Sequence, residues 1–393
     1  MASGNFAEAI PLYQQLIKAL PDNPGLMLNL GIAQHMAGGH DREAILQFQA
    51  VLKQQPQALP ALILLGASYL RVGDPIKAIP PLEKSVAAQP NDKETRQMLA
   101  DALVMTNRHG AAAEQLKRLA EIDPQDPKTW YELGQRYEAL SQQAFEKLQK
   151  TAPGSFYVLE LLADARRSQG RRAAAEALQH EASAVKPAAT KAAEALYKQT
   201  KHYNQLAVEA FSHLERLPPS VELHRLLAET MRNQDRHRDS IGEWREALKL
   251  APGDPHLEQE LAVSIYLSKD YAAAEPMLRG VLQNEPTSPE LNFYLGDTLL
   301  NLQRPEVAIP LLLRVPQMPA AHAALGRAYM ETGQAAEAIP HLKVALPIDD
   351  DGSLHYQLSR AYQTTGQSTL AKEALAKYQE IVKARESQKA DRP

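Results

Sequence analysis

Residues 59–92 read LPALILLGASYLRVGDPIKAIPPLEKSVAAQPND, which contains two apolar segments with helical spacing. Between them, Gly73 suits the left-handed end of one helix, Asp74 can cap the next helix, and Pro75 fits its first position. Pro90 ends the second segment, because proline cannot continue a helix. The stretch therefore predicts two antiparallel helices joined by a tight turn.

The pair Leu65-Gly66 belongs to a pattern, a Leu followed mostly by a small residue, that recurs along nearly the whole chain. Five of the ten spacings between successive marker leucines are 34 residues, and most units also carry an Ala and a Pro at the places of Ala78 and Pro90. The markers are Leu30, Leu65, Leu99, Leu133, Leu162, Leu196, Leu227, Leu261, Leu295, Leu325 and Leu358. This repeat resembles the tetratricopeptide repeat family, whose unit of 34 residues folds as two antiparallel helices.

The resemblance implies an all-α fold, a right-handed α-α superhelical solenoid of about eleven and a half helical hairpins. It divides the chain into four parts. These are an N-terminal array over 1–126 that starts with a half repeat, irregular units with shortened turns over 127–220, a C-terminal array with a capping helix over 221–385, and a solvated tail over 386–393.

Two features depart from a regular repeat. Units 127–155 and 190–220 lack the Gly or Pro expected in the turn between helices, which predicts long, nearly continuous helices there. Two ordinary hairpins with tight polar turns are the alternative. Five second helices carry an internal proline, and we expect each to lie on the outer face and to bend its helix without breaking it. These prolines are Pro11, Pro80, Pro276, Pro310 and Pro340.

The composition excludes several classes of function. The 43 basic and 47 acidic residues give a net charge of −4, which argues against a general binder of nucleic acid or of anionic membranes. Cysteine is absent, so disulfides, thiolate metal sites and cysteine nucleophiles are excluded. No apolar run predicts a membrane span, and no metal, phosphate-loop or serine-hydrolase motif is found. We therefore expect a protein that is not an enzyme and needs neither cofactor nor metal.

The N-terminal half repeat lacks its first helix, which leaves Phe6, Tyr13 and Leu16 with fewer partners than their equivalents elsewhere. The opening Met1-Ala2-Ser3-Gly4 indicates a trimmed start, which would explain the missing helix. The sequence then allows two compartments: the cytoplasm, or an exported location if a signal peptide was removed. The alternative explanation of the half repeat is an exposed edge that takes a helix from a partner or from a second copy, which would allow self-association. Repeats rich in Ala, Gln and Leu also suggest a bacterial source.

The resemblance implies that positions 2, 5, 9, 12 and 13 of each first helix line a concave groove that binds a peptide. In the N-terminal array these positions indicate an apolar surface with one positive charge, and the irregular units continue it. The candidates there are Leu28, Ile32, Ile63, Leu70, Arg71, Gln97, Asp101, Met105, Tyr131 and Gln135. These residues could equally shield one another or have covered a missing helix.

The same positions of the C-terminal array carry mixed charges with aromatic rings, which suits a polar peptide with an aromatic anchor. The candidates are Arg225, Glu229, Arg232, Gln259, Tyr266, Phe293, Asp297, Asn301 and Arg327. Pairing of these arginines with acidic residues of neighbouring helices is the alternative. The sequence thus predicts a non-catalytic scaffold that holds a protein or peptide segment in its groove. The second hypothesis is the repeat region of a larger enzyme or regulator whose catalytic part is absent.

Overall fold

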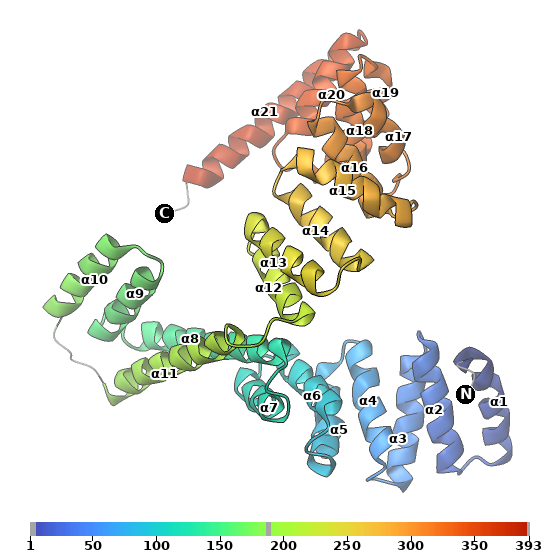
Figure 1. The fold of residues 1–393 in the computed structure, drawn as a ribbon, viewed down its shortest axis with the longest axis vertical. Coiled ribbons are helices and arrows are strands. Elements are labelled where there is room, and N and C mark those ends of the chain that lie inside the picture. The colour runs from blue at the N-terminus through green and yellow to red at the C-terminus, as the bar shows by residue number, and fades with distance from the viewer. Residues whose placement is uncertain (1–4, 186–189, 391–393) are drawn as a thin grey trace. The chain divides into compact units, whose positions relative to one another are not determined.

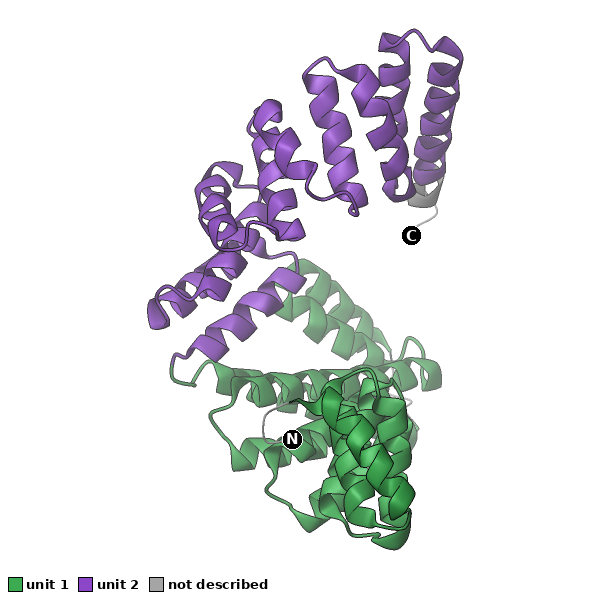
Figure 2. Ribbon diagram, turned by 90° about the vertical axis from the view of Figure 1, so that its right-hand side faces the viewer, with its two compact units in different colours: residues 1–218 green, residues 219–393 purple. Residues whose placement is uncertain are grey.

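The computed structural model describes residues 5–185 and 190–390, which form twenty-one α-helices and one short 3-10 helix (Figure 1). The chain forms two compact units, residues 1–218 and 219–393 (Figure 2). The first unit contains α1 (Phe6–Ala19), α2 (Pro24–Ala37), α3 (Asp41–Gln54), α4 (Leu59–Arg71), α5 (Pro75–Ala88), α6 (Lys93–Met105), α7 (His109–Ile122), α8 (Pro127–Thr151), α9 (Phe156–Ser168), α10 (Arg172–Ala184) and α11 (Lys191–Leu214).

The second unit contains α12 (Val221–Asn233), α13 (His237–Leu250), α14 (Pro255–Leu267), α15 (Tyr271–Asn284), α16 (Pro289–Asn301), α17 (Pro305–Leu312), α18 (Pro319–Glu331), α19 (Ala335–Ala345), η1 (Leu346–Ile348), α20 (Ser353–Thr364) and α21 (Ser368–Ala390). No helix within the described ranges is both long and apolar enough to cross a membrane.

The turn between α4 and α5 forms as its sequence predicts. Gly73 has a φ of +76°, and the Asp74 carboxylate accepts a hydrogen bond from the backbone N–H of Lys77 at 3.3 Å. Pro75 occupies the first position of α5. Asn107, with a φ of 57°, takes the place of the glycine in the next repeat. In these two repeats, local turn chemistry therefore ends the first helix and starts the second.

Close contact between the two helices of a repeat explains the glycine that follows several of the marker leucines. A Cβ atom on Gly66 would lie 2.5 Å from Cγ of Leu82, and one on Gly31 would lie 2.6 Å from Cε1 of Phe48. First helices also pack on their successors, as α2, α4 and α6 do in one unit and α14, α16, α18 and α20 do in the other. We call the surface formed by positions 2, 5, 9, 12 and 13 of the first helices the inner face.

The internal prolines do not break their helices, as the repeat predicts. Pro11, Pro80, Pro276, Pro310 and Pro340 all lie inside α-helices, and all five are exposed. An exposed position removes one backbone hydrogen bond without burying the freed carbonyl, since water can satisfy it. The periodicity of the repeat is therefore the better guide here than the rule that proline breaks a helix.

The region 127–220 contains the long helices that were predicted, but they do not form separate units. α8 has 25 residues, α11 has 24, and the two helices pack along each other (Figure 1). A Cβ on Gly134 would lie 2.6 Å from Cε1 of Phe211, which repeats the contact of Gly66 with Leu82. The first half of α8 and the second half of α11 therefore form one repeat, with about 60 residues inserted between its helices.

We call residues 142–202 the inserted arm; it contains the α9–α10 hairpin. The expectation that 127–155 and 190–220 are separate units was wrong, because no residue between Tyr137 and Phe145 stops the helix. α8 therefore runs past the place of the turn as one continuous element. The described helices accordingly make ten pairs plus α1, where eleven and a half hairpins were expected.

The chain ends also differ from the expectation. α21 continues to Ala390, so the predicted tail from residue 386 is helical as far as it is described. Three predictions fall in part on residues outside the described ranges: the trimmed start at Met1-Ala2-Ser3-Gly4, the irregular units at residues 186–189, and the tail at residues 391–393.

Candidate functional site

The inner face of the first unit carries one arginine that was expected to be a free positive charge. Nη2 of Arg71 lies 3.0 Å from Oδ2 of Asp41, and the Asp41 carboxylate also contacts Nδ1 of His35 at 2.9 Å. Arg71 is therefore tied to a largely buried acid of the preceding repeat, and it joins α4 to the N-terminus of α3.

The same cluster contains a hydroxyl, an imidazole and a carboxylate, the groups of a hydrolase triad. Oγ of Ser68 and Oδ1 of Asp41 both approach Nδ1 of His35, at 2.8 and 2.9 Å. Nε2 of His35 instead lies 3.2 Å from Nη1 of Arg71, which can only donate. A triad needs its hydroxyl and its carboxylate on opposite ring nitrogens. The cluster therefore links helices and is not a nucleophilic site.

The stability of the first unit should depend on the protonation of His35. Burial lowers the pKa of His35 below its ordinary 6.5, and the neighbouring Arg71 lowers it further. The folded state then binds a proton at His35 less readily than the unfolded state. The contribution of neutral His35 to the free energy of unfolding is therefore fully present above about pH 6.5 and is lost as the pH falls below that value.

Urea unfolding of wild type and His35→Gln between pH 8 and pH 5 measures this effect. We expect the wild type to lose stability more steeply than the variant on acidification. His40→Gln, at an exposed site in the same unit, serves as the control and should keep the wild-type slope. Parallel curves for wild type and His35→Gln would contradict the prediction.

The other candidates in the first unit lie in two groups. Nε2 of Gln97 donates to Asp101 and to Glu132, both at 2.9 Å, so these polar side chains satisfy one another. The apolar candidates Leu28, Ile32 and Leu70 are partly buried and pack on the core cluster of α3–α7, and Ile63 is half-buried. Met105 is exposed, Tyr131 lies with its ring 6.0 Å from that of Phe211, and Gln135 accepts a bond from Arg136.

In the second unit, Asp297 joins candidates from three successive first helices. Its carboxylate accepts hydrogen bonds from Tyr266 of α14 at 3.1 Å, from Asn301 of α16 at 3.0 Å and from Arg327 of α18 at 3.1 Å. Burial raises the pKa of the Tyr266 hydroxyl, and Asp297 raises it further, so this hydroxyl remains a donor. Four residues named from the sequence thus form one cluster.

The remaining candidates of the second unit are mostly paired as well. Arg225 lies 3.9 Å from Glu229 within α12, and Arg232 is bonded to Glu260 of α14. The ring of Phe293 lies 5.7 Å from that of Tyr294, which in turn neighbours Tyr266, while Gln259 is half-buried on α14. Each arginine candidate therefore has an acidic partner inside the protein.

A pocket of about 430 Å³ lies on the inner face between α18 and α20. We call it the terminal pocket; it is lined by Arg327, Met330, Glu331, Ser353, Tyr356, Gln357 and Arg360. Arg360 is exposed and has no side-chain partner among the described residues, and the buried Oε1 of Gln357 has none either. Of these residues only Arg327 was expected from the sequence, although Tyr356 and Arg360 occupy positions 5 and 9 of α20.

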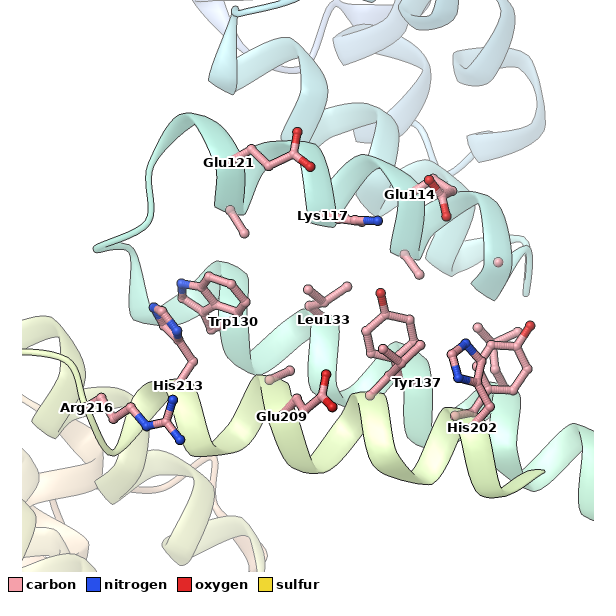
Figure 3. A pocket seen from close by; sticks show the side chains of 17 residues that line it. Glu114, Lys117, Glu121, Trp130, Leu133, Tyr137, His202, Glu209, His213 and Arg216 are labelled. Atoms are coloured by element: carbon pink, nitrogen blue, oxygen red, sulfur yellow. The ribbon is translucent and has the colours of Figure 1, made fainter. Parts of the chain in front are cut away.

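A larger cavity of about 820 Å³ lies between the second helices α7 and α11, with α8 as its floor (Figure 3). We call it the lateral pocket. The Trp130 ring stacks on that of His213 with centroids 3.8 Å apart, and Tyr137 lies 6.4 Å from Tyr203. Glu114, Lys117 and Glu121 of α7 line the opposite side (Figure 3). Sequence reasoning missed this pocket because its two walls lie about 90 residues apart, as Glu121 and His213 do.

Within the described ranges, no three His, Asp or Glu side chains come together in a way that could hold a metal ion.

Models of the tetratricopeptide repeat match residues 1–59, 69–137, 266–318, 310–353 and 352–381. A curated relative, the Vi polysaccharide export protein VexE of Salmonella typhi, is 30% identical over 123 residues. That match covers 30% of this chain and 19% of VexE, so the chain spans about a fifth of the length of this relative.

Two solved structures are similar to part of this chain. MamA from Desulfovibrio magneticus RS-1 is 20% identical, with 42% of this chain and 96% of that chain covered and a TM-score of 0.38. The structure titled "YrrB: a TPR protein with an unusual peptide-binding site" is 19% identical, with 40% and 84% covered and a TM-score of 0.35.

Proposed function

Because the chain belongs to the tetratricopeptide repeat family, we propose that it is a non-catalytic scaffold whose inner face binds a segment of another protein. Repeats of this family typically mediate protein–protein interactions, and the stacked hairpins within one unit offer a continuous surface for an extended chain. The proposal is that the partner segment lies along the first helices, across both charged and aromatic side chains.

The terminal pocket is the observation that carries this proposal. Elsewhere on the inner face the arginines Arg71, Arg232 and Arg327 have acidic partners inside the protein. Arg360 has none among the described residues, and the guanidinium group forms strong bidentate bonds with carboxylates. An unpaired guanidinium on an otherwise satisfied surface supports binding of an acidic group there.

Two further groups in the terminal pocket suit a peptide. The buried Oε1 of Gln357 lacks a donor, and a backbone N–H of a bound segment would supply one. Tyr356 is 46% exposed, and its ring rests on Tyr378 with centroids 5.4 Å apart. A ring held in this way offers a preformed apolar contact at low entropic cost.

Cross-linking in cells of the source organism tests the proposal. A photoreactive residue at position 356 should capture a protein partner, and Arg360→Glu should reduce the capture by about tenfold, as expected for loss of a charged hydrogen bond. Arg314→Glu makes the same charge change at an exposed site outside the pocket and should leave the capture intact. Equal capture by both variants would contradict the proposal.

A second candidate is that the chain is the partner-recognition region of a larger enzyme or regulator. It is favoured by the match to VexE, of which the chain spans about a fifth. An antibody against residues 219–393 would test it in the source organism. A band far larger than 393 residues would support the idea, and a band of about that size would contradict it.

A further inference from the structure

Arg96 stands at a position where neighbouring repeats carry apolar side chains. It is the fourth residue of α6, and the equivalent residues of α2, α4 and α8 are Met27, Leu62 and Trp130. Arg96 is only 7% exposed. An ionised side chain therefore stands where α2, α4 and α8 carry an apolar group, whereas the equivalent residues of the second unit are polar, namely His224, Glu258, Asn292, His322 and His355.

The partners of Arg96 do not neutralise its charge. Nη1 donates to Oε1 of Gln115 at 2.6 Å, and Nη2 donates to the backbone carbonyl of Pro90 at 2.5 Å. The buried Nε has no hydrogen-bond partner, and no carboxylate of the described residues lies within 4.0 Å of the guanidinium. The guanidinium of Arg96 therefore lacks an anionic partner among the described residues. A buried charge without a counter-charge is costly to a fold.

A cavity of about 560 Å³ adjoins Arg96. A second guanidinium lines it, that of Arg118 on α7, which lies 2.6 Å from the carboxylate of Glu121. Asn91 and Pro90, in the loop before α6, line another side. Burial and the charge of Arg118 lower the pKa of Arg96, whereas Glu121 raises it. Glu121 thus neutralises the charge of Arg118 by direct contact, whereas it acts on the charge of Arg96 only from a distance.

We propose that this cavity binds a phosphate group, with Arg96 and Arg118 as its cationic donors. Donors line the cavity from three elements, namely α6, α7 and the loop at Asn91. A tetrahedral anion can accept from three directions at once, whereas a carboxylate presents two oxygens in one plane. Glu121 is the internal competitor, because it occupies the Arg118 guanidinium in the absence of the anion. The site uses no residue of the inner face and does not depend on the proposed function.

Calorimetric titration with inorganic phosphate at constant ionic strength tests the proposal, with acetate as the control anion. Wild type should bind phosphate with a dissociation constant below ~10 mM and should bind acetate at least about tenfold more weakly. Arg96→Met should reduce phosphate affinity by about tenfold or more, as expected for loss of a charged hydrogen bond. This variant should fold, since Met27 occupies the equivalent place in α2.

Two further variants keep the test decisive if Arg96→Met is poorly folded. Arg118→Gln should also weaken phosphate binding, while Glu121→Gln should strengthen it by removing the competing carboxylate. Glycerol phosphate separates the two sources of the ligand group: tighter binding than inorganic phosphate identifies a phosphate ester, and equal or weaker binding identifies the free ion. No phosphate binding by wild type, equal affinity in wild type and Arg96→Met, or acetate binding as strong as phosphate binding would overturn the proposal.

Discussion

Replacement of Trp244 by alanine should lower the free energy of unfolding of residues 219–393 by about 3–5 kcal/mol, the cost of removing a large buried aromatic side chain. Trp244 on α13 is fully buried and belongs to the core cluster that includes Ala228, Leu257 and Leu261. The truncation leaves a cavity between α12, α13 and α14, where the helices of a solenoid cannot collapse without losing contact with their neighbours. The effect should be largest in these three helices.

Hydrogen exchange read by mass spectrometry measures the loss helix by helix. Peptides from α12–α14 should lose protection, whereas peptides from α2–α7 should not, because they belong to the other compact unit. Trp244→Phe is the matched control: it keeps most of the ring volume and removes an Nε1 that has no hydrogen-bond partner. It should cost less than half as much as alanine. An equal loss of protection in α2–α7 would contradict the assignment of Trp244 to a separate unit.

Gly134→Val should destabilise residues 1–218 by about 3 kcal/mol, the upper part of the range for overpacking a core. A Cβ at this position would lie 2.6, 2.7 and 2.9 Å from three atoms of the Phe211 ring. Three added carbon atoms have no space there, so α8 and α11 must separate or the ring must move. Urea unfolding followed by circular dichroism gives the change in stability.

The pairing of α8 with α11 makes a second variant informative. Phe211→Ala removes the ring that Gly134→Val would strike. The double variant should therefore lose clearly less stability than the sum of the losses in the two single variants. Gly110→Val on α7 is the control, since a Cβ there meets no atom within 4 Å. Additive effects of Gly134→Val and Phe211→Ala would contradict the contact between these helices.

The regular repeats could be predicted from the sequence because their contacts are local. Marker leucines spaced by 34 residues, Gly73 in a left-handed turn and Pro75 at a helix start each act within one hairpin. The pairing of α8 with α11 was missed because spacing along the chain cannot reveal an insertion between two helices of one repeat. A signal was present: Ala207, Phe211 and Pro219 repeat the spacing of Ala44, Phe48 and Pro56.

The inner-face positions were predictable in the same way, but their electrostatic state was not. Position rules place Arg327 and Asp297 on successive first helices, yet only side-chain geometry shows that they bond to each other at 3.1 Å. The same limit hid Arg96, whose neighbours Gln115 and Pro90 are both uncharged. Whether a charge is compensated depends on which neighbours reach it, and a repeat pattern does not record that.

The long connection between α8 and α11 has a kinetic consequence. Gly66 and Leu82, like Gly296 and Leu312, are 16 positions apart, whereas Gly134 and Phe211 are 77 positions apart. Closing a flexible loop of the longer length costs about 1.4 kcal/mol more chain entropy. Prior pairing of α9 with α10 shortens the flexible path and removes part of this cost. The repeat that carries the inserted arm should therefore form last in residues 1–218, and it should hold the folding rate of this unit below the rate that its other, local contacts would allow.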